Sequence, residues 1–187
     1  MKREDLNFLP VAINITDKKI IIIGGGKVGY HKASILFRFT DKATVISPEF
    51  HKGFESLPFG LIKKEYSADD LDGAFLVYVC TEDEALNAQI KKDAEQKGIL
   101  TSVCDNPILC DFTSPAIFKQ GNVNIAVTSN ARDVYQSINI RNQIKDLVEN
   151  GKLIIEQQSD AVQAYNSECG LECLVTHSEK KLDRFIK

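Results

Sequence analysis

The chain has 187 residues, a length that accommodates one full domain and a smaller attachment. Its composition, 43% hydrophobic and 26% charged, is that of an ordinary globular protein and excludes a disordered or fibrous one. A formal net charge of −3 excludes a global attraction to nucleic acid or to an anionic membrane, so an anionic substrate would need a local basic patch.

The N-terminal residues 1–19 alternate apolar and polar side chains, and no apolar run approaches the length of a membrane span. We therefore expect neither a signal peptide nor a membrane segment. Five cysteines in a chain of this length are typical of reduced thiols, and their odd number excludes complete pairing within the chain. Together these features predict a cytoplasmic protein.

Strand and helix patterns alternate through the first 104 residues. A β-branched run at 20–23 predicts a strand buried on both faces, and apolar residues at helical spacing follow over 27–39. Further elements are expected as strands at 43–46, 61–62, 75–80 and 99–103, and as a helix at 84–97 that ends before Gly98. In that helix the lysines are expected to face outward, and the inward positions are Ala85, Leu86, Ile90 and Ala94. This alternation predicts an α/β fold, a Rossmann-like doubly wound parallel sheet with right-handed crossovers.

The pattern changes after residue 113. Two strand-like runs, 115–118 and 123–127, flank Gly121-Asn122 and predict a β-hairpin. A polar-rich helix is expected over 133–149, with a buried face formed by Ile138, Ile140, Ile144, Leu147 and Val148. We therefore expect three parts: a Rossmann-like domain at 1–113, a small α+β segment at 114–150, and a short, partly helical C-terminal segment at 151–187.

The segment Gly24-Gly25-Gly26-Lys27-Val28-Gly29 fits G-x-G-x-x-G directly after the first strand and before the first helix. In such a motif Gly24 permits a tight turn, Gly26 lets a pyrophosphate approach the backbone, and Gly29 allows close packing of helix on strand. The helix N-terminus then offers unpaired N–H groups to the phosphates. A glycine-rich turn that merely joins strand to helix is the alternative. Because strand, helix and second strand are all present, the pattern favours dinucleotide binding, with Lys27 and Val28 among the contacts.

The choice of dinucleotide depends on the residues after the second strand, Ser47-Pro48-Glu49. Glu49 is placed where an acidic side chain accepts hydrogen bonds from a ribose diol, and a 2′-phosphate would meet its carboxylate. NAD is therefore the expected cofactor. Glu49 as a solvated loop residue is the alternative. Thr81 follows the strand at 75–80 and is expected to line the same cofactor site.

Several spaced motifs occur in one order between residues 8 and 129. They are FLPVAINI at 8–15, IIIIGGGKV at 20–28, TVISPE at 44–49, CTED at 80–83, GILTSVCDNP at 98–107 and CDF at 110–112. In this order they resemble the N-terminal module of siroheme synthases, the family of precorrin-2 dehydrogenases and sirohydrochlorin ferrochelatases.

The resemblance implies oxidation of precorrin-2 to sirohydrochlorin with transfer of a hydride to NAD. It also implies a homodimer, with 114–150 as its dimerisation segment, and it places the family's key catalytic aspartate at Asp105. A carboxylate there, at the carboxyl end of the fifth strand, would face the ligand crevice of a doubly wound sheet. From the residues alone, Asp105 as a cap of the Asn106-Pro107 turn is an equal alternative.

The tetrapyrrole substrate carries many carboxylates, so cations are expected around its pocket. Arg132 and Arg141 are candidates because a guanidinium binds a carboxylate in a bidentate manner, although a solvated charge is the alternative for each. Ser129 keeps its place in the family's substrate pocket. The chain departs from the family at Asn130 and Ala131, where two glycines are usual; asparagine tolerates the left-handed conformation better than most residues.

The C-terminal segment contains Cys169, Cys173 and His177 at successive i, i+4 steps, a spacing with which a helix could hold a soft metal. Gly170 weakens such a helix and the usual C-x-x-C pair is absent, so ordinary packing is expected and no metal site is assigned. A further weakly amphipathic stretch lies at 182–186.

Three functions remain open from the sequence. The leading hypothesis is an NAD-dependent precorrin-2 dehydrogenase with Asp105 as proton acceptor. A bifunctional dehydrogenase and ferrochelatase is the second, because the same carboxylate would serve either step. A non-catalytic protein that binds NAD or a tetrapyrrole is the third, motivated by the altered loop at 130–135. We expect no nucleic-acid or membrane partner.

Overall fold

The computed structural model describes residues 5–155, which divide into two compact units. The first runs to Ala116 and includes Val127–Ile138, and the second comprises Ile117–Ala126 and the chain from Asn139. None of the described helices is long and apolar enough to cross a membrane. The expected helical stretch at 182–186 lies outside the described residues, as do Cys169, Cys173 and His177.

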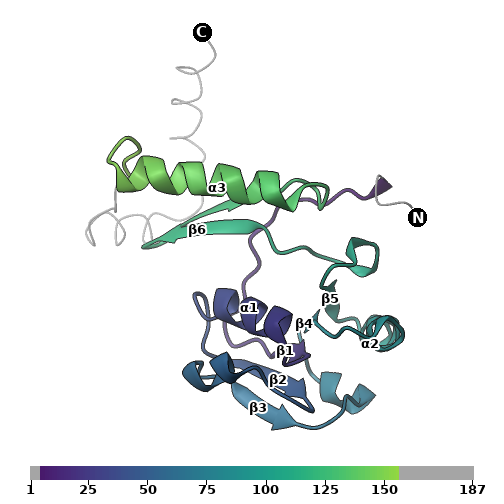
Figure 1. Ribbon diagram of the computed structural model, residues 1–187. Coiled ribbons are helices and arrows are strands. Elements are labelled where there is room, and N and C mark those ends of the chain that lie inside the picture. The colour runs from purple at the N-terminus through teal and green to yellow at the C-terminus, as the bar shows by residue number, and fades with distance from the viewer. Residues whose placement is uncertain (1–4, 156–187) are drawn as a thin grey trace, which may run out of the picture. The chain divides into compact units, whose positions relative to one another are not determined.

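The first unit is built on a five-stranded parallel sheet in the order β3-β2-β1-β4-β5 (Figure 1). Its strands are β1 (Ile20–Ile23), β2 (Ala43–Ser47), β3 (Gly60–Lys63), β4 (Leu76–Val79) and β5 (Leu100–Val103). The strand order reverses between β1 and β4, which creates the switch point of a doubly wound sheet. The predicted fold class is confirmed.

Two helices, α1 (Lys27–Leu36) and α2 (Glu84–Gln96), cover opposite faces of this sheet. The side chains of β1 alternate between the faces: the first and third isoleucines pack with Ala33 of α1, and the second and fourth with Ile90 of α2. All four isoleucines are buried, as expected for a strand with period-two alternation between two covered faces.

The inward face of α2 differs from the expected one. Ile90 and Ala94 are buried as predicted, but Ala85 is exposed and Lys91 is buried, although the lysines were expected to face outward. The reason is that the Lys91 ammonium lies 2.6 Å from a carboxylate oxygen of Asp111, and a charged group can be buried when it is paired.

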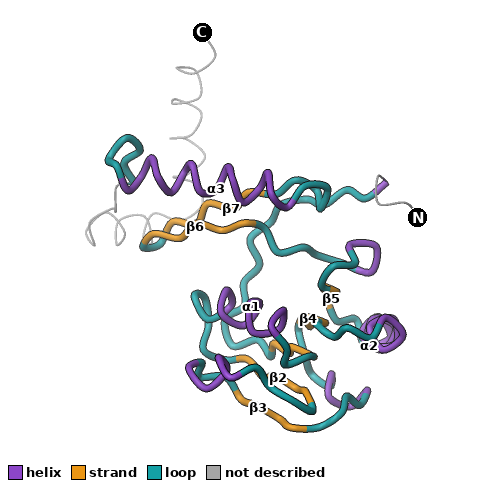
Figure 2. Tube along the Cα trace, viewed as in Figure 1, coloured by secondary structure: helices purple, strands orange, loops and turns teal. Residues whose placement is uncertain are grey.

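The second unit contains most of a β-hairpin and the C-terminal part of a helix. The hairpin pairs β6 (Ala116–Gln120) with β7 (Val123–Val127), as predicted, and turns at Gly121, which has a positive φ of 56°. Figure 2 shows this hairpin beside α3 (Val134–Glu149). Gly151, with φ 68°, follows the helix end as expected.

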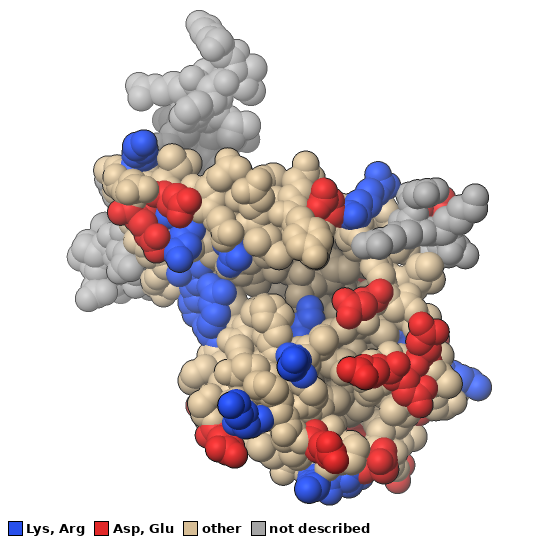
Figure 3. Space-filling model, in the orientation of Figure 1, with Lys and Arg blue, Asp and Glu red and all other residues tan. Residues whose placement is uncertain are grey.

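Within residues 5–155, α3 does not have the buried face that its apolar spacing predicts. Ile138, Ile140 and Leu147 are 38%, 41% and 42% exposed, and of the residues in α3 only Ser137 is buried. A two-stranded hairpin offers too little apolar surface to cover a helix of this length. Figure 3 shows the middle of α3 as largely uncharged surface on the face in view.

Candidate functional site

The glycine loop joins β1 to α1 at the carboxyl edge of the sheet, and two of its glycines are required by close approaches. Gly24 has φ 108°, and a Cβ on it would lie 2.5 Å from the carbonyl oxygen of Cys80. A Cβ on Gly29 would lie 2.0 Å from the carbonyl oxygen of Gly24. The structure thus gives Gly24 the tight turn and Gly29 the close helix–strand packing that the motif predicts.

Gly26 lies at the start of α1 in open space. It is the N-cap residue, with φ −72° and ψ −168°, and apart from its neighbours along the chain no atom of the described residues lies within 4 Å of the position of a Cβ on it. No side chain caps the helix, and its first turn contains no acidic residue. Lys27 and Val28 are exposed beside it. An uncapped helix N-terminus presents N–H groups and a partial positive charge, so this space fits an anionic group such as a pyrophosphate.

The segment after β2 packs directly on the glycine loop through Gly25. A Cβ on Gly25 would lie 2.2 Å from the carbonyl oxygen of Glu49 and 2.9 Å from the Cβ of Ser47. The backbone N–H of His51 also donates to the Gly25 carbonyl at 2.7 Å. Ser47 is buried, whereas Pro48 and Glu49 are exposed. These contacts bring Glu49 beside the loop, a role for Gly25 that the motif itself does not specify.

Thr81 follows β4 and borders the same loop, since its backbone nitrogen lies 3.1 Å from the Cβ position of Gly24. Its hydroxyl donates to Oδ1 of Asn87 at 2.6 Å, and the Asn87 amide donates to the Thr81 carbonyl at 3.1 Å. Asp83 caps α2 by accepting from the first free N–H groups of the helix. This network fixes Thr81 at the carboxyl edge of the sheet.

Asp105 lies in the turn after β5 with a left-handed φ of 66°, a conformation that aspartate adopts more readily than most residues. Its side chain is exposed and forms no hydrogen bond or ion pair with the described part of the chain. The turn is instead closed by the backbone, with the Asn106 N–H donating to the Val103 carbonyl at 3.3 Å. No hydrogen bond within the described residues therefore supports Asp105 as a cap of this turn, and its carboxylate remains available to a ligand.

The segment that carries Asp105 is tied back to β5. The Asp111 carboxylate accepts from the Thr101 N–H at 2.9 Å and from the Lys91 ammonium at 2.6 Å. The Cys110 sulfur lies 3.2 Å from both the nitrogen and the carbonyl oxygen of Val103. These contacts hold both ends of the loop that Asp105 begins.

The three candidate substrate contacts divide between a turn of the first unit and the helix of the second unit. The Ser129 hydroxyl donates to the Asp133 carbonyl at 2.6 Å and accepts from the Asp133 N–H at 3.0 Å, so it is engaged in the turn before α3. Arg132 is exposed in that same turn. Arg141 belongs to the second unit, where it donates to the Ile117 carbonyl at 3.4 Å. Its Nε is buried with no partner among the described residues.

Asn130 and Ala131 adopt left-handed conformations, with φ 57° and 58°. The Asn130 side chain accepts from the Phe8 N–H at 2.5 Å and donates to the Leu6 carbonyl at 2.7 Å. The tolerance expected of Asn130 is therefore confirmed, and the loop keeps positive φ values at the positions where the family usually has glycine.

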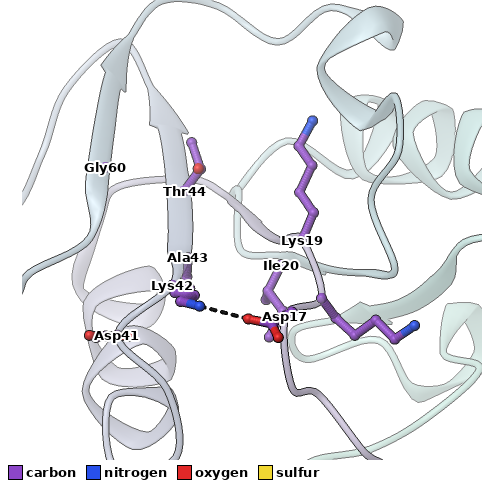
Figure 4. A pocket seen from close by; sticks show the side chains of 9 residues that line it. Asp17, Lys19, Ile20, Asp41, Lys42, Ala43, Thr44 and Gly60 are labelled. Carbon is purple, nitrogen blue, oxygen red and sulfur yellow. Dashed lines mark hydrogen bonds and ion pairs between the residues drawn. The ribbon is translucent and has the colours of Figure 1, made fainter.

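A hollow of about 490 Å³ lies at the opposite edge of the sheet, at the amino ends of β1 and β2. Figure 4 shows the Lys42–Asp17 ion pair across its mouth, with N and O 2.7 Å apart. Ligands of doubly wound sheets bind outside the carboxyl ends of the strands. The glycine loop and Asp105, not this hollow, therefore form the candidate site.

Comparison with known proteins identifies the family to which the chain belongs. A family model described as "Putative NAD(P)-binding" matches residues 11–116, a range that includes the glycine loop and Asp105. A siroheme synthase of Psychrobacter sp. (strain PRwf-1) is 31% identical over 150 residues, which are 78% of this chain and 31% of that protein. A siroheme synthase of Ectopseudomonas mendocina (strain ymp) is 34% identical over 126 residues, 66% of this chain and 27% of that protein.

The chain thus spans less than a third of the length of these curated relatives. The solved structure named "SirC, precorrin-2 dehydrogenase" superposes with a TM-score of 0.64 at 17% identity, over 74% of this chain and 70% of that one. At this identity the likeness shows the fold. The predicted resemblance to siroheme synthases is confirmed.

Proposed function

Because the chain belongs to this family of NAD(P)-binding domains, we propose that it is an NAD-dependent precorrin-2 dehydrogenase, which oxidises precorrin-2 to sirohydrochlorin. The observation that carries the proposal is the arrangement at one edge of the sheet. The open helix N-terminus at Gly26 and the carboxylate of Asp105 follow β1 and β5, on either side of β4. The similarity to siroheme synthases and to the protein named SirC, precorrin-2 dehydrogenase, supports this substrate.

The preference for NAD over NADP is assigned to Glu49. Its carboxylate is exposed, and its backbone is held against Gly25 next to the open helix N-terminus. The hydroxyls of a ribose diol donate hydrogen bonds to a carboxylate there, whereas a 2′-phosphate is repelled. We expect Glu49→Gln to reduce the ratio of NADP to NAD dissociation constants, measured by calorimetry. An unchanged ratio would remove Glu49 from cofactor selection.

Asp105 is assigned as the proton acceptor. Dehydrogenation removes a hydride and a proton from the substrate, and a bound nicotinamide accepts the hydride. The Asp105 carboxylate has no competing hydrogen bond within residues 5–155, so it is free to take the proton. The Lys91–Asp111 pair and the contacts of Cys110 hold the loop that positions it.

Ser129, Arg132 and Arg141 remain our candidates for binding the substrate's carboxylates. The unpartnered Nε of Arg141 supports this role, because a guanidinium with a free N–H can still accept a carboxylate as a partner. We expect Arg141→Lys to raise the KM for precorrin-2 while NAD affinity is unchanged, since a lysine lacks the planar fork. An unchanged KM would exclude Arg141 from the substrate site.

A homodimer is the proposed assembly, formed through the hairpin and α3. The supporting observation is the exposure of large apolar side chains on this part of the chain, namely Val123, Ile140, Leu147, Leu153 and Ile154. Light scattering of the purified protein should give twice the chain mass. Ile140→Glu, which places a charge on the exposed face, should shift it toward the single-chain value.

The activity is tested by incubating purified protein with precorrin-2 and NAD and following NADH and the sirohydrochlorin spectrum. Asp105→Asn should lower turnover by about 100-fold or more, the range expected for loss of a general base, while NAD affinity is retained. Asp41→Asn is the matched control, because Asp41 is also exposed but lies in the hollow at the opposite edge. It should leave turnover unchanged.

One result would contradict the dehydrogenase, and another would contradict only the role of Asp105. Absence of turnover in a wild-type protein that binds NAD would exclude the dehydrogenase. Wild-type turnover in Asp105→Asn would leave the dehydrogenase standing but show that another group takes the proton.

A further inference from the structure

Two thiols meet beneath the glycine loop. Cys80 directly follows β4 and Cys104 directly follows β5, which are parallel neighbours paired up to Val79 and Val103. Their sulfur atoms lie 3.0 Å apart. Neighbouring strands are about 4.8 Å apart, within the range of roughly 4.4–6.8 Å between the Cα atoms of a disulfide. A bond between the two sulfurs therefore requires movement of the side chains and not of the strands.

The surroundings make Cys104 the more reactive of the two. A hydrogen bond from the Cys80 thiol lowers the pKa of Cys104, and the nearby Lys32 ammonium lowers it further, against the opposing effects of burial and of Asp105. The same hydrogen bond, together with burial, raises the pKa of Cys80. Thiolate is the species that reacts with oxidants, and electropositive, partly exposed positions favour it. Cys104 is half-buried and Cys80 is buried, so an oxidant meets Cys104 first.

We propose that Cys80 and Cys104 are a site of reversible oxidation, which closes into a disulfide on reaction with a hydroperoxide and reopens with a dithiol. The Cys104 thiolate attacks a peroxide oxygen, forms a sulfenic acid and releases hydroxide (or the alkoxide of an organic peroxide). The Cys80 sulfur then attacks the sulfenic sulfur, the S–S bond forms, and the sulfenic oxygen leaves as water with the Cys80 proton. The thiols lose an electron pair, and the peroxide is reduced.

The position of the pair connects it to the candidate site. The Cys80 carbonyl is the atom that forbids a side chain on Gly24, and the Cys80 Cβ lies 3.7 Å from the Cβ position of Gly29. Cys104 immediately precedes Asp105. A disulfide would join the residue that packs against the glycine loop, Cys80, to the turn that carries Asp105. Oxidation is therefore expected to lower turnover, a consequence that rests on the proposed function, whereas the thiol chemistry itself does not.

The thiol chemistry is tested on the full chain with Cys110, Cys169 and Cys173 replaced by serine, which leaves only the pair. After hydrogen peroxide, the protein should lose the mass of two hydrogens and all reactivity toward a thiol reagent under denaturing conditions, and dithiothreitol should restore both. Adding Cys80→Ser to this background gives the matched control, in which Cys104 should be trapped as a sulfenic acid by dimedone. A non-reducing peptide map of peroxide-treated wild-type protein should show the same Cys80–Cys104 link. This second measurement tests the inference even where a serine variant folds poorly.

Persistence of both thiols after peroxide would overturn the inference, and so would a sulfinic acid at Cys104 with a titratable Cys80 thiol. The effect of oxidation on the enzyme is measured separately, as the precorrin-2 turnover of the oxidised protein and of the same protein after reduction. We expect at least a several-fold loss on oxidation and full recovery on reduction. Unchanged turnover of fully oxidised protein would refute a regulatory role, while a protein without turnover in either state would refute the proposed function and leave the thiol result intact.

Discussion

Gly26→Ala should weaken NAD binding and leave the stability of the protein nearly unchanged, so it tests the proposed role of the glycine loop apart from its folding. The φ and ψ of Gly26, −72° and −168°, are ordinary extended values that alanine adopts, and among residues 5–155 only its neighbours along the chain lie within 4 Å of the added methyl group. Alanine restricts the unfolded chain and so contributes about 0.4–1 kcal/mol of stability. Alanine is also a poorer N-cap than glycine, by about the same amount. We therefore expect the free energy of unfolding to change by no more than about 0.5 kcal/mol.

The same methyl group would occupy the space in which the pyrophosphate is proposed to lie. Loss of one hydrogen bond between a backbone N–H and a charged phosphate costs about 1.5–3 kcal/mol. Since about 1.4 kcal/mol corresponds to a tenfold change, the dissociation constant of NAD should rise by about 10- to 100-fold. Calorimetric titration with NAD and urea unfolding of the same preparation measure the two effects.

Two further glycine variants serve as controls for Gly26→Ala. Gly60→Ala, in β3, places its methyl 3.7 Å from the Thr44 hydroxyl, an ordinary contact, and should leave NAD affinity unchanged while raising the free energy of unfolding by about 0.4–1 kcal/mol. Gly29→Ala places a methyl 2.0 Å from the Gly24 carbonyl oxygen, so the backbone must shift. It should lose about 2 kcal/mol or more of stability as well as binding. Wild-type NAD affinity in Gly26→Ala would refute the placement of the pyrophosphate.

Three other expectations concern stability and reactivity. Ala131→Gly should raise the free energy of unfolding, measured by urea unfolding, by about 0.5 kcal/mol, because glycine relieves the strain of the left-handed φ of 58° by more than its larger entropy in the unfolded chain costs. A lower free energy of unfolding would contradict this. Lys91→Met should lower the free energy of unfolding by about 1–2 kcal/mol, because the Asp111 carboxylate keeps its hydrogen bond from the Thr101 N–H but loses its ionic partner. Lys92 is exposed, so Lys92→Met should have little effect; equal effects would show that the pair does not stabilise the fold. The rate of Cys104 alkylation, measured as a function of pH, should have its midpoint below the ordinary thiol pKa of about 8.5, because the lowered pKa of Cys104 lets its thiolate form at lower pH. A midpoint at or above that value would contradict the greater reactivity assigned to Cys104.

The sequence predicted the fold of the first unit because the signals there are local. The isoleucine run at 20–23 ends at a glycine, helical spacing follows, and this alternation is repeated through the strand at 99–103. Only a parallel sheet with helices on both faces buries such strands. The G-x-G-x-x-G spacing likewise predicted the turn at Gly24 and the packing at Gly29, because steric exclusion of a Cβ is a property of the motif itself.

The tertiary structure alone decided which distant residues meet. Lys91 is buried because Asp111 reaches it from the loop after β5, a pairing that helical periodicity does not encode. Cys80 and Cys104 are adjacent because β4 and β5 are neighbours in register, and Gly25 is confined by the segment that follows β2. The apolar positions of α3 show the opposite case: their spacing predicted a buried face, but Ile138, Ile140 and Leu147 are exposed in the part of the chain that the structure describes. Periodicity specifies which side of an element is apolar, whereas strand order and chain reversal determine what lies against it.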